Sequence, residues 1–140
     1  MSKPPFPTIP IANADTKPFW DGCARETFLL QRCTACHAYR HPPSAICSKC
    51  LSEQCEWIPA GGAGTVYSFT VVREQRGGGW DVMVPYVLTV VELDEGPHVL
   101  TNLTGIEPAD VKIGMRVAVS FTVLADGTKL PLFGPVATRP

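Results

Sequence analysis

Charge is scarce in this 140-residue sequence, and long apolar runs are absent. Asp, Glu, Lys and Arg make up 18% of the residues, and the formal net charge is −1. Such a balance gives no global attraction for the phosphates of nucleic acid. No segment approaches the ~20 consecutive apolar residues of a membrane-spanning helix. The 45% of hydrophobic residues still suffices for a packed core, which excludes a disordered chain.

The first twenty residues lack the features of an export signal. Prolines interrupt the sequence where a signal peptide needs a continuous apolar segment (MSKPPFPTIPIANADTKPFW). We therefore expect a cytoplasmic protein, in which thiols stay reduced. This expectation disfavours disulfides as the explanation for the six cysteines.

Four of the cysteines form two Cys-x-x-Cys pairs in the stretch CTACHAYRHPPSAICSKC, residues 33–50. A thioredoxin-type redox motif uses one such pair at the start of a helix, but the intervening HPPSAI is poor in helix-forming residues. Two pairs in sequence are typical of a zinc ribbon, in which each pair turns tightly and places two sulfurs on one metal ion. Four thiolates leave no position for water. The sequence thus predicts a closed, structural Zn²⁺ site formed by Cys33, Cys36, Cys47 and Cys50.

The other cysteines and the nearby histidines are not needed as ligands. His37 and His41 lie beside the pairs, but four cysteines already complete a tetrahedral set. Cys23 and Cys55 lie outside the pairs, and no neighbouring base marks either as an activated nucleophile. We expect both to be small buried residues.

Turn residues and changes of pattern divide the chain into three predicted parts. Residues 1–26 should form a proline-rich arm and a helix, residues 27–58 the ribbon, and residues 59–140 a second domain. The helix is expected near residues 16–25, capped by Asp15 or Thr16. Its spacing predicts one apolar face, made of Phe19, Trp20, Cys23 and Ala24. The two aromatic residues suit either a partner interface or packing on the chain's own ribbon.

Short segments between turn signals predict the strands. In the ribbon, the first strand is expected in TFLLQR, which is sufficiently apolar, and two more are expected in AYRHPP and EQCEWI. After PAGGAG, five more segments between turn signals predict a small all-β barrel, namely 65–74, 86–93, 98–105, 115–124 and 129–136. The stretch IEPADVKIG before the fourth of these reads as a short helical turn or a loop.

Over roughly residues 16–136, the order and spacing of these segments closely resemble the DUF35 family. The motifs that carry the resemblance are PFWDGCARETFLLQRCTACHAYRHPPSAICSKC, PAGGAGTVYSFTV, PYVLTVVELDEG, VKIGMRVAVSF and LPLF. The resemblance implies a mainly β fold with an N-terminal helix, a rubredoxin-like zinc ribbon and a C-terminal five-stranded OB-fold. The four paired cysteines match the family's zinc ligands. Cys55 does not belong to that set, and His37 stands where the family often has glycine.

The resemblance also implies a function that spacing alone would not show. DUF35 proteins are similar to accessory subunits of thiolases, hydroxymethylglutaryl-CoA synthases and lipid-transfer-type aldolases. The catalytic residues then lie in the partner, and the small subunit supports the partner's fold and helps to hold the coenzyme A (CoA) part of an acyl-CoA. A hetero-oligomer such as α2β2 is the expected assembly. In agreement, the sequence contains no convincing set of nucleophile, base and orienting residue.

A CoA thioester needs cations for its phosphates and an apolar path for its pantetheine arm. The best basic cluster available is Arg40 with His41 in the ribbon and Arg73 with Arg76 beside the glycine-rich stretch EQRGGGW. We predict that these residues border a CoA channel shared with the catalytic partner. Taken singly, each of the arginines is also compatible with an ordinary solvated charge.

Two other functions compete with the accessory-subunit hypothesis. OB-folds often bind single-stranded nucleic acid, for which Tyr67, Phe69 and Tyr86 offer stacking surfaces, but the basic residues are spread out. A stand-alone enzyme acting on acyl-CoA is the other. A salt-dependent gel shift would support the first, and turnover by the purified single chain would support the second.

Overall fold

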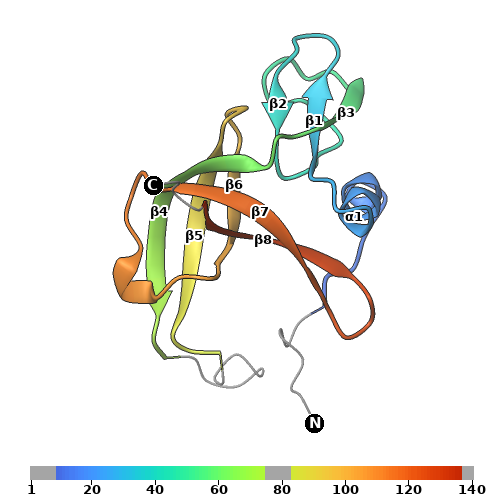
Figure 1. The fold of residues 1–140 in the computed structure, drawn as a ribbon. Coiled ribbons are helices and arrows are strands. Elements are labelled where there is room, and N and C mark those ends of the chain that lie inside the picture. The colour runs from blue at the N-terminus through green and yellow to red at the C-terminus, as the bar shows by residue number, and fades with distance from the viewer. Residues whose placement is uncertain (1–8, 75–82, 137–140) are drawn as a thin grey trace.

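The computed structural model describes residues 9–74 and 83–136, which form one helix, a small sheet and a closed barrel (Figure 1). No helix in these ranges is long and apolar enough to cross a membrane. The elements in chain order are α1 (Lys17–Ala24), β1 (Leu29–Cys33), β2 (Tyr39–Arg40), β3 (Cys55–Pro59), β4 (Ala63–Val72), β5 (Tyr86–Leu93), β6 (His98–Leu103), β7 (Arg116–Val123) and β8 (Lys129–Pro135).

Helix α1 lies where the sequence predicts it. Thr16 is the N-cap residue, but its side chain makes no capping bond. The Asn13 Oδ1 atom instead accepts hydrogen bonds from the backbone N–H groups of Asp15 and Thr16, each at 3.0 Å. Phe19 and Cys23 are buried as predicted. Ala24 is exposed, which corrects the predicted face, because the helix ends there and the chain turns away.

The first sheet has the order β2-β1-β3, with β1 in the centre and both neighbours antiparallel. The pairing brings Leu30 opposite Ile58 and Cys33 opposite Cys55. All three predicted ribbon strands are present, but β2 is only two residues long. Pro42 and Pro43 follow it and have no N–H to continue the ladder.

The second sheet closes into a barrel of order β4-β5-β6-β8-β7, in which β7 pairs back onto β4. This is a five-stranded Greek-key barrel, and the five predicted segments each contain one strand. The stretch before β7 contains one short 3-10 turn, Pro108–Asp110. The predicted mainly β class with a single N-terminal helix is therefore confirmed.

Glycine at the start of β4 allows the barrel to close. A Cβ atom on Gly64 would overlap the backbone carbonyl of Glu92 on β5. Gly62, two residues earlier, has a φ of 78°, which side chains rarely adopt. The PAGGAG motif thus serves the passage from ribbon to barrel.

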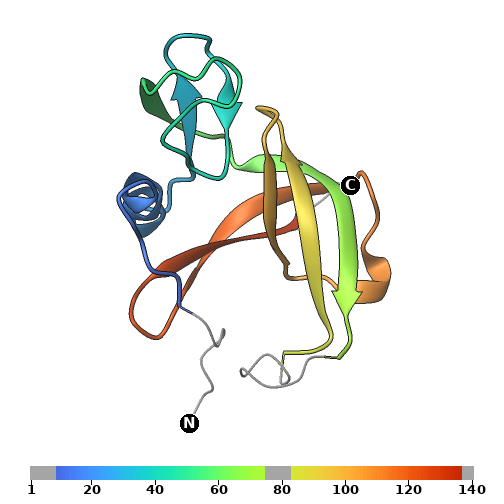
Figure 2. The ribbon, with the colours of Figure 1, turned by 180° about the vertical axis from the view of Figure 1, so that it is seen from behind.

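An aromatic cluster joins helix, ribbon and barrel. The ring of Phe28 lies 5.2 Å from Phe19 of α1, 5.4 Å from His41 and 6.2 Å from Phe133 of β8, measured between centroids. Figure 2 shows α1 and the ribbon on the same side of the barrel. Phe19 therefore belongs to the chain's own core, whereas Trp20 is only partly buried at its border.

Candidate functional site

The two Cys-x-x-Cys pairs bring four sulfur atoms together at the end of the ribbon. All four Sγ atoms lie within 4.8 Å of one another. Cys33 and Cys50 are 3.5 Å apart, and Cys36 and Cys47 are 3.7 Å apart, again between Sγ atoms. Sulfurs bound at ~2.3 Å around a tetrahedral Zn²⁺ would be separated by about 3.8 Å. The donor set and its spacing thus fit one zinc ion without rearrangement.

Both pairs have the same backbone geometry. In each, the residue after the second cysteine donates its N–H to the carbonyl of the first cysteine at 2.9 Å. These residues are His37 and Leu51, with φ angles of 65° and 64°. Side chains are uncommon in this left-handed conformation, which glycine adopts freely. This backbone requirement explains why glycine would suit the position of His37.

Backbone donors lower the pKa of one thiol in each pair, whereas the neighbouring cysteines raise the pKa of Cys50 to about 12. The N–H of Cys36 points to the Cys33 Sγ atom at 3.5 Å and lowers the pKa of the Cys33 thiol to about 6. The N–H groups of Cys50 and Lys49 likewise lower the pKa of Cys47. Thiolates are the form that binds metal. Because four thiolates fill a tetrahedron, the arrangement suits a structural ion rather than one that activates water.

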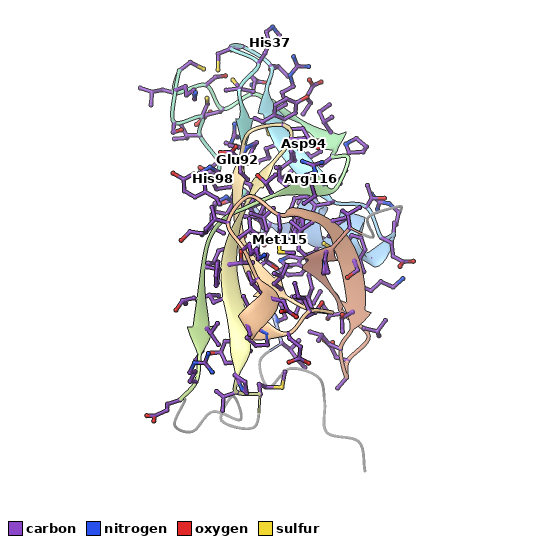
Figure 3. All side chains as sticks on the ribbon, turned by 60° about the vertical axis from the view of Figure 1, so that its left-hand side comes forward. His37, Glu92, Asp94, His98, Met115 and Arg116 are labelled. Carbon is purple, nitrogen blue, oxygen red and sulfur yellow. The ribbon has the colours of Figure 1, made fainter. Side chains whose placement is uncertain are left out.

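The remaining cysteines lie apart from this cluster. Cys23 is fully buried, and desolvation raises its pKa to about 12, which makes it an unreactive thiol. Cys55 is partly buried, and its Sγ atom lies 3.7 Å from the amide nitrogen of Gln31. His37 stands at the outer tip of the ribbon (Figure 3).

The sequence analysis missed a buried polar network that orders the segment between the two pairs. Gln31 is only 4% exposed, and its Oε1 atom accepts hydrogen bonds from the Arg40 Nε atom (2.9 Å) and the Ser44 backbone N–H (2.8 Å). The Arg40 Nη2 atom also donates to the carbonyl of Ser44 at 2.8 Å. The available signal was a glutamine that directly follows the apolar residues of the predicted strand TFLLQR. Arg40 is therefore part of the ribbon's internal architecture.

The residues predicted to border a CoA channel lie in two distant places. His41 packs against both Phe19 and Phe28, and desolvation lowers the pKa of its imidazole to about 4. Arg73 is exposed directly after β4, at the end of that strand away from the ribbon (Figure 1). Arg76 falls outside the described residues. The structure thus groups Arg40 with His41 but not with Arg73, and their contact with CoA stays a prediction.

Comparison with known proteins finds a zinc ribbon followed by an OB-fold. The family model of the ChsH2 rubredoxin-like zinc ribbon matches residues 20–56, and that of the ChsH2 C-terminal OB-fold matches residues 57–122. A solved structure described as the Ltp2-ChsH2(DUF35) aldolase superposes with a TM-score of 0.82 at 35% identity, covering 91% of this chain and 98% of that one. The chain belongs to the DUF35 family. The family's zinc ribbon and the four-cysteine cluster together support a structural zinc ion in this DUF35 protein.

Two curated relatives extend the comparison. A probable enoyl-CoA hydratase alpha subunit of Thermomonospora curvata is 35% identical over 130 residues, which are 93% of this chain and 40% of that protein. A DUF35 domain-containing scaffold protein of Pyrococcus furiosus is 41% identical over 76 residues, covering 54% of this chain and 55% of that protein. The chain therefore spans less than half of the hydratase subunit that it matches.

Proposed function

We propose that this DUF35 chain is a non-catalytic subunit that associates with a catalytic subunit of the Ltp2 type and acts with it on acyl-CoA thioesters. The observation that carries the proposal is the match to the Ltp2-ChsH2(DUF35) aldolase, which extends over almost all of both chains. An aldolase makes or breaks a carbon–carbon bond, and we assign that reaction class to the complex. The likeness to a probable enoyl-CoA hydratase alpha subunit supports the acyl-CoA substrate class.

The zinc ion has an architectural role in this proposal. We assign one ion per chain to Cys33, Cys36, Cys47 and Cys50. It would cross-link the two cysteine turns of the ribbon. The ribbon needs such a link because its strands have only two to five residues, and so small a sheet is not stable by itself. Apparent binding energies of structural zinc in small domains are roughly 10–16 kcal/mol, as large as the stability of a whole domain.

The polar pairs on the described surface support a non-catalytic role. The Glu92 Oε2 and His98 Nε2 atoms are 3.1 Å apart, and Asp94 makes a bidentate ion pair with Arg116 at 2.7 and 2.9 Å (Figure 3). Arg116 holds the pKa of Asp94 below its usual range. About half of each side chain in these pairs is exposed, so water surrounds them. Catalytic carboxylates and histidines usually act from clefts that exclude water.

The CoA moiety is proposed as a ligand shared with the catalytic subunit. Arg73 supports this proposal best, because it is an exposed guanidinium, a group that binds phosphate well. Arg40 is hydrogen-bonded to Gln31 and Ser44, and burial keeps His41 neutral. These two residues would therefore shape the ribbon side of the channel and would not bind its phosphates.

Co-production with Ltp2 of the solved aldolase tests the proposed function. We expect a stable complex that cleaves or forms a carbon–carbon bond in an acyl-CoA, and no turnover by this chain alone. Size-exclusion chromatography with light scattering measures assembly, and acyl-CoA turnover is followed by liquid chromatography. Turnover by the isolated chain, or failure of the wild-type chain to bind Ltp2, would overturn the proposal.

A further inference from the structure

Two apolar grooves meet on one side of the barrel. The first, with a volume of about 230 Å³, lies between α1 with the aromatic cluster and the strands β6 and β8. The second, of about 160 Å³, crosses the outer face of β4, β5 and β6. Leu100 on β6 lines both grooves and is 69% exposed. We call the continuous surface that they form the apolar strip.

The apolar strip contains no charge. None of the residues that line the two grooves is Asp, Glu, Lys or Arg. His41, which lines the first groove, is kept neutral at physiological pH by its burial. Depletion of charge together with aromatic residues such as Trp20 and Phe28 is the composition that distinguishes the core of a protein–protein interface.

Two ion pairs of the described residues lie at the rim of the strip. Lys129 directly precedes Leu130 of the first groove, and its Nζ atom lies 3.4 Å from the Glu26 carboxylate. At the other end of the strip, Glu92 on β5 pairs with His98 on β6. These two residues face outward like Val90 and Leu100, because every second residue of a strand faces the same side. The strip therefore has an uncharged centre, and the two ion pairs lie at its edges.

This distribution of charge indicates which kind of molecule can bind the strip. Single-stranded nucleic acid needs a basic groove along its phosphates, and a membrane surface needs basic residues around an apolar face. Neither is available on the strip. A charged protein segment would lose its hydration there without gaining a partner charge. The complementary surface is an apolar, uncharged segment of another protein.

We propose that the apolar strip is the docking surface for the catalytic subunit, with Leu100 and Trp20 as its anchors. This inference rests on the proposed function and adds the place of contact. The partner presents an uncharged apolar segment that fills the first groove and continues across Leu100 onto the outer face of β5. The imidazole of His41, which forms no hydrogen bond with any described residue, faces a polar group of that segment.

The variant Leu100→Glu tests the docking surface, and Ile113→Glu is its matched control. Ile113 is 63% exposed but lines neither groove. Each variant is co-produced with Ltp2, and the dissociation constant is measured by biolayer interferometry. We expect Leu100→Glu to weaken binding at least about 30-fold, as at an interface hot spot, and Ile113→Glu to bind like wild type. Both should melt within a few degrees of the wild-type chain, since both side chains are exposed.

The possible results separate this inference from the proposed function. If the wild-type chain binds Ltp2 and Leu100→Glu binds equally well, the docking surface is wrong while the proposed function stands. If the wild-type chain does not bind Ltp2, both are overturned. Light scattering of the chain alone tests whether a second copy of the chain binds the strip. A dimer that the variant Leu100→Glu dissociates would overturn the assignment to the catalytic subunit. Binding of a labelled oligothymidine that Leu100→Glu abolishes would do the same.

Discussion

Acidification should destabilise the chain through His41, whose imidazole packs against Phe19 and Phe28 with its ring centroid 5.4 Å from that of each. Desolvation lowers its pKa from 6.5 to about 4 in the folded chain. The unfolded chain therefore binds a proton at a higher pH than the folded chain does. Stability from this residue is fully present above pH 6.5 and is lost as the pH falls toward 4.

The magnitude follows from the difference between the two pKa values. One pKa unit corresponds to about 1.4 kcal/mol, so lowering the pH from 7 to 5 should remove about 2 kcal/mol of unfolding free energy through His41. The measurement is urea unfolding of the zinc-loaded chain at pH 7, 6 and 5, compared with His41→Leu. Loss of zinc at low pH affects both proteins, so the difference between their pH dependences isolates the histidine.

The urea experiment needs a control variant in which the wild-type histidines are unchanged. The control is Ile113→Leu, which changes an exposed residue that does not titrate and should keep the pH dependence of the wild-type chain. If wild type and His41→Leu lose stability in parallel between pH 7 and 5, the imidazole is not held neutral by burial, and the reasoning fails.

Three further predictions concern the metal site, the ribbon backbone and CoA. Cys36→Ser should abolish zinc binding whereas Cys23→Ser should retain one ion per chain, as measured by mass spectrometry of the native protein; equal zinc in both would refute the four-ligand assignment. His37→Gly should be more stable than His37→Ala by about 1 kcal/mol in thermal unfolding, because a residue with a Cβ atom is strained at a φ of 65° and glycine is not. Arg73→Ala should raise the KM for acyl-CoA in the assembled complex several-fold, equivalent to about 1 kcal/mol, with kcat unchanged; an unaltered KM would exclude a phosphate contact at this position.

Local patterns were sufficient for the zinc ribbon and for the strands. Two Cys-x-x-Cys pairs can converge on one ion almost regardless of the rest of the chain, because the chelating geometry belongs to each short turn. Strands such as TVYSFTVV and YVLTVVEL were predictable for a similar reason, since alternation and β-branching act within a few residues. The end of α1 was predicted less well: Ala24 fits the helical spacing but lies where the helix stops.

Tertiary structure alone decided which side chains those strands bring together. Gln31 and Arg40 meet only because β2 pairs with β1, and this pairing gives Arg40 an internal role in the ribbon. His41 becomes neutral because Phe19 of α1 and Phe28 pack against its ring, a burial that no neighbour in sequence reveals. Leu100 joins two grooves because β6 lies both beside β5 and at the opening toward β8. Contacts of this kind depend on residues far apart in the chain, and the sequence by itself determined only the elements that make them.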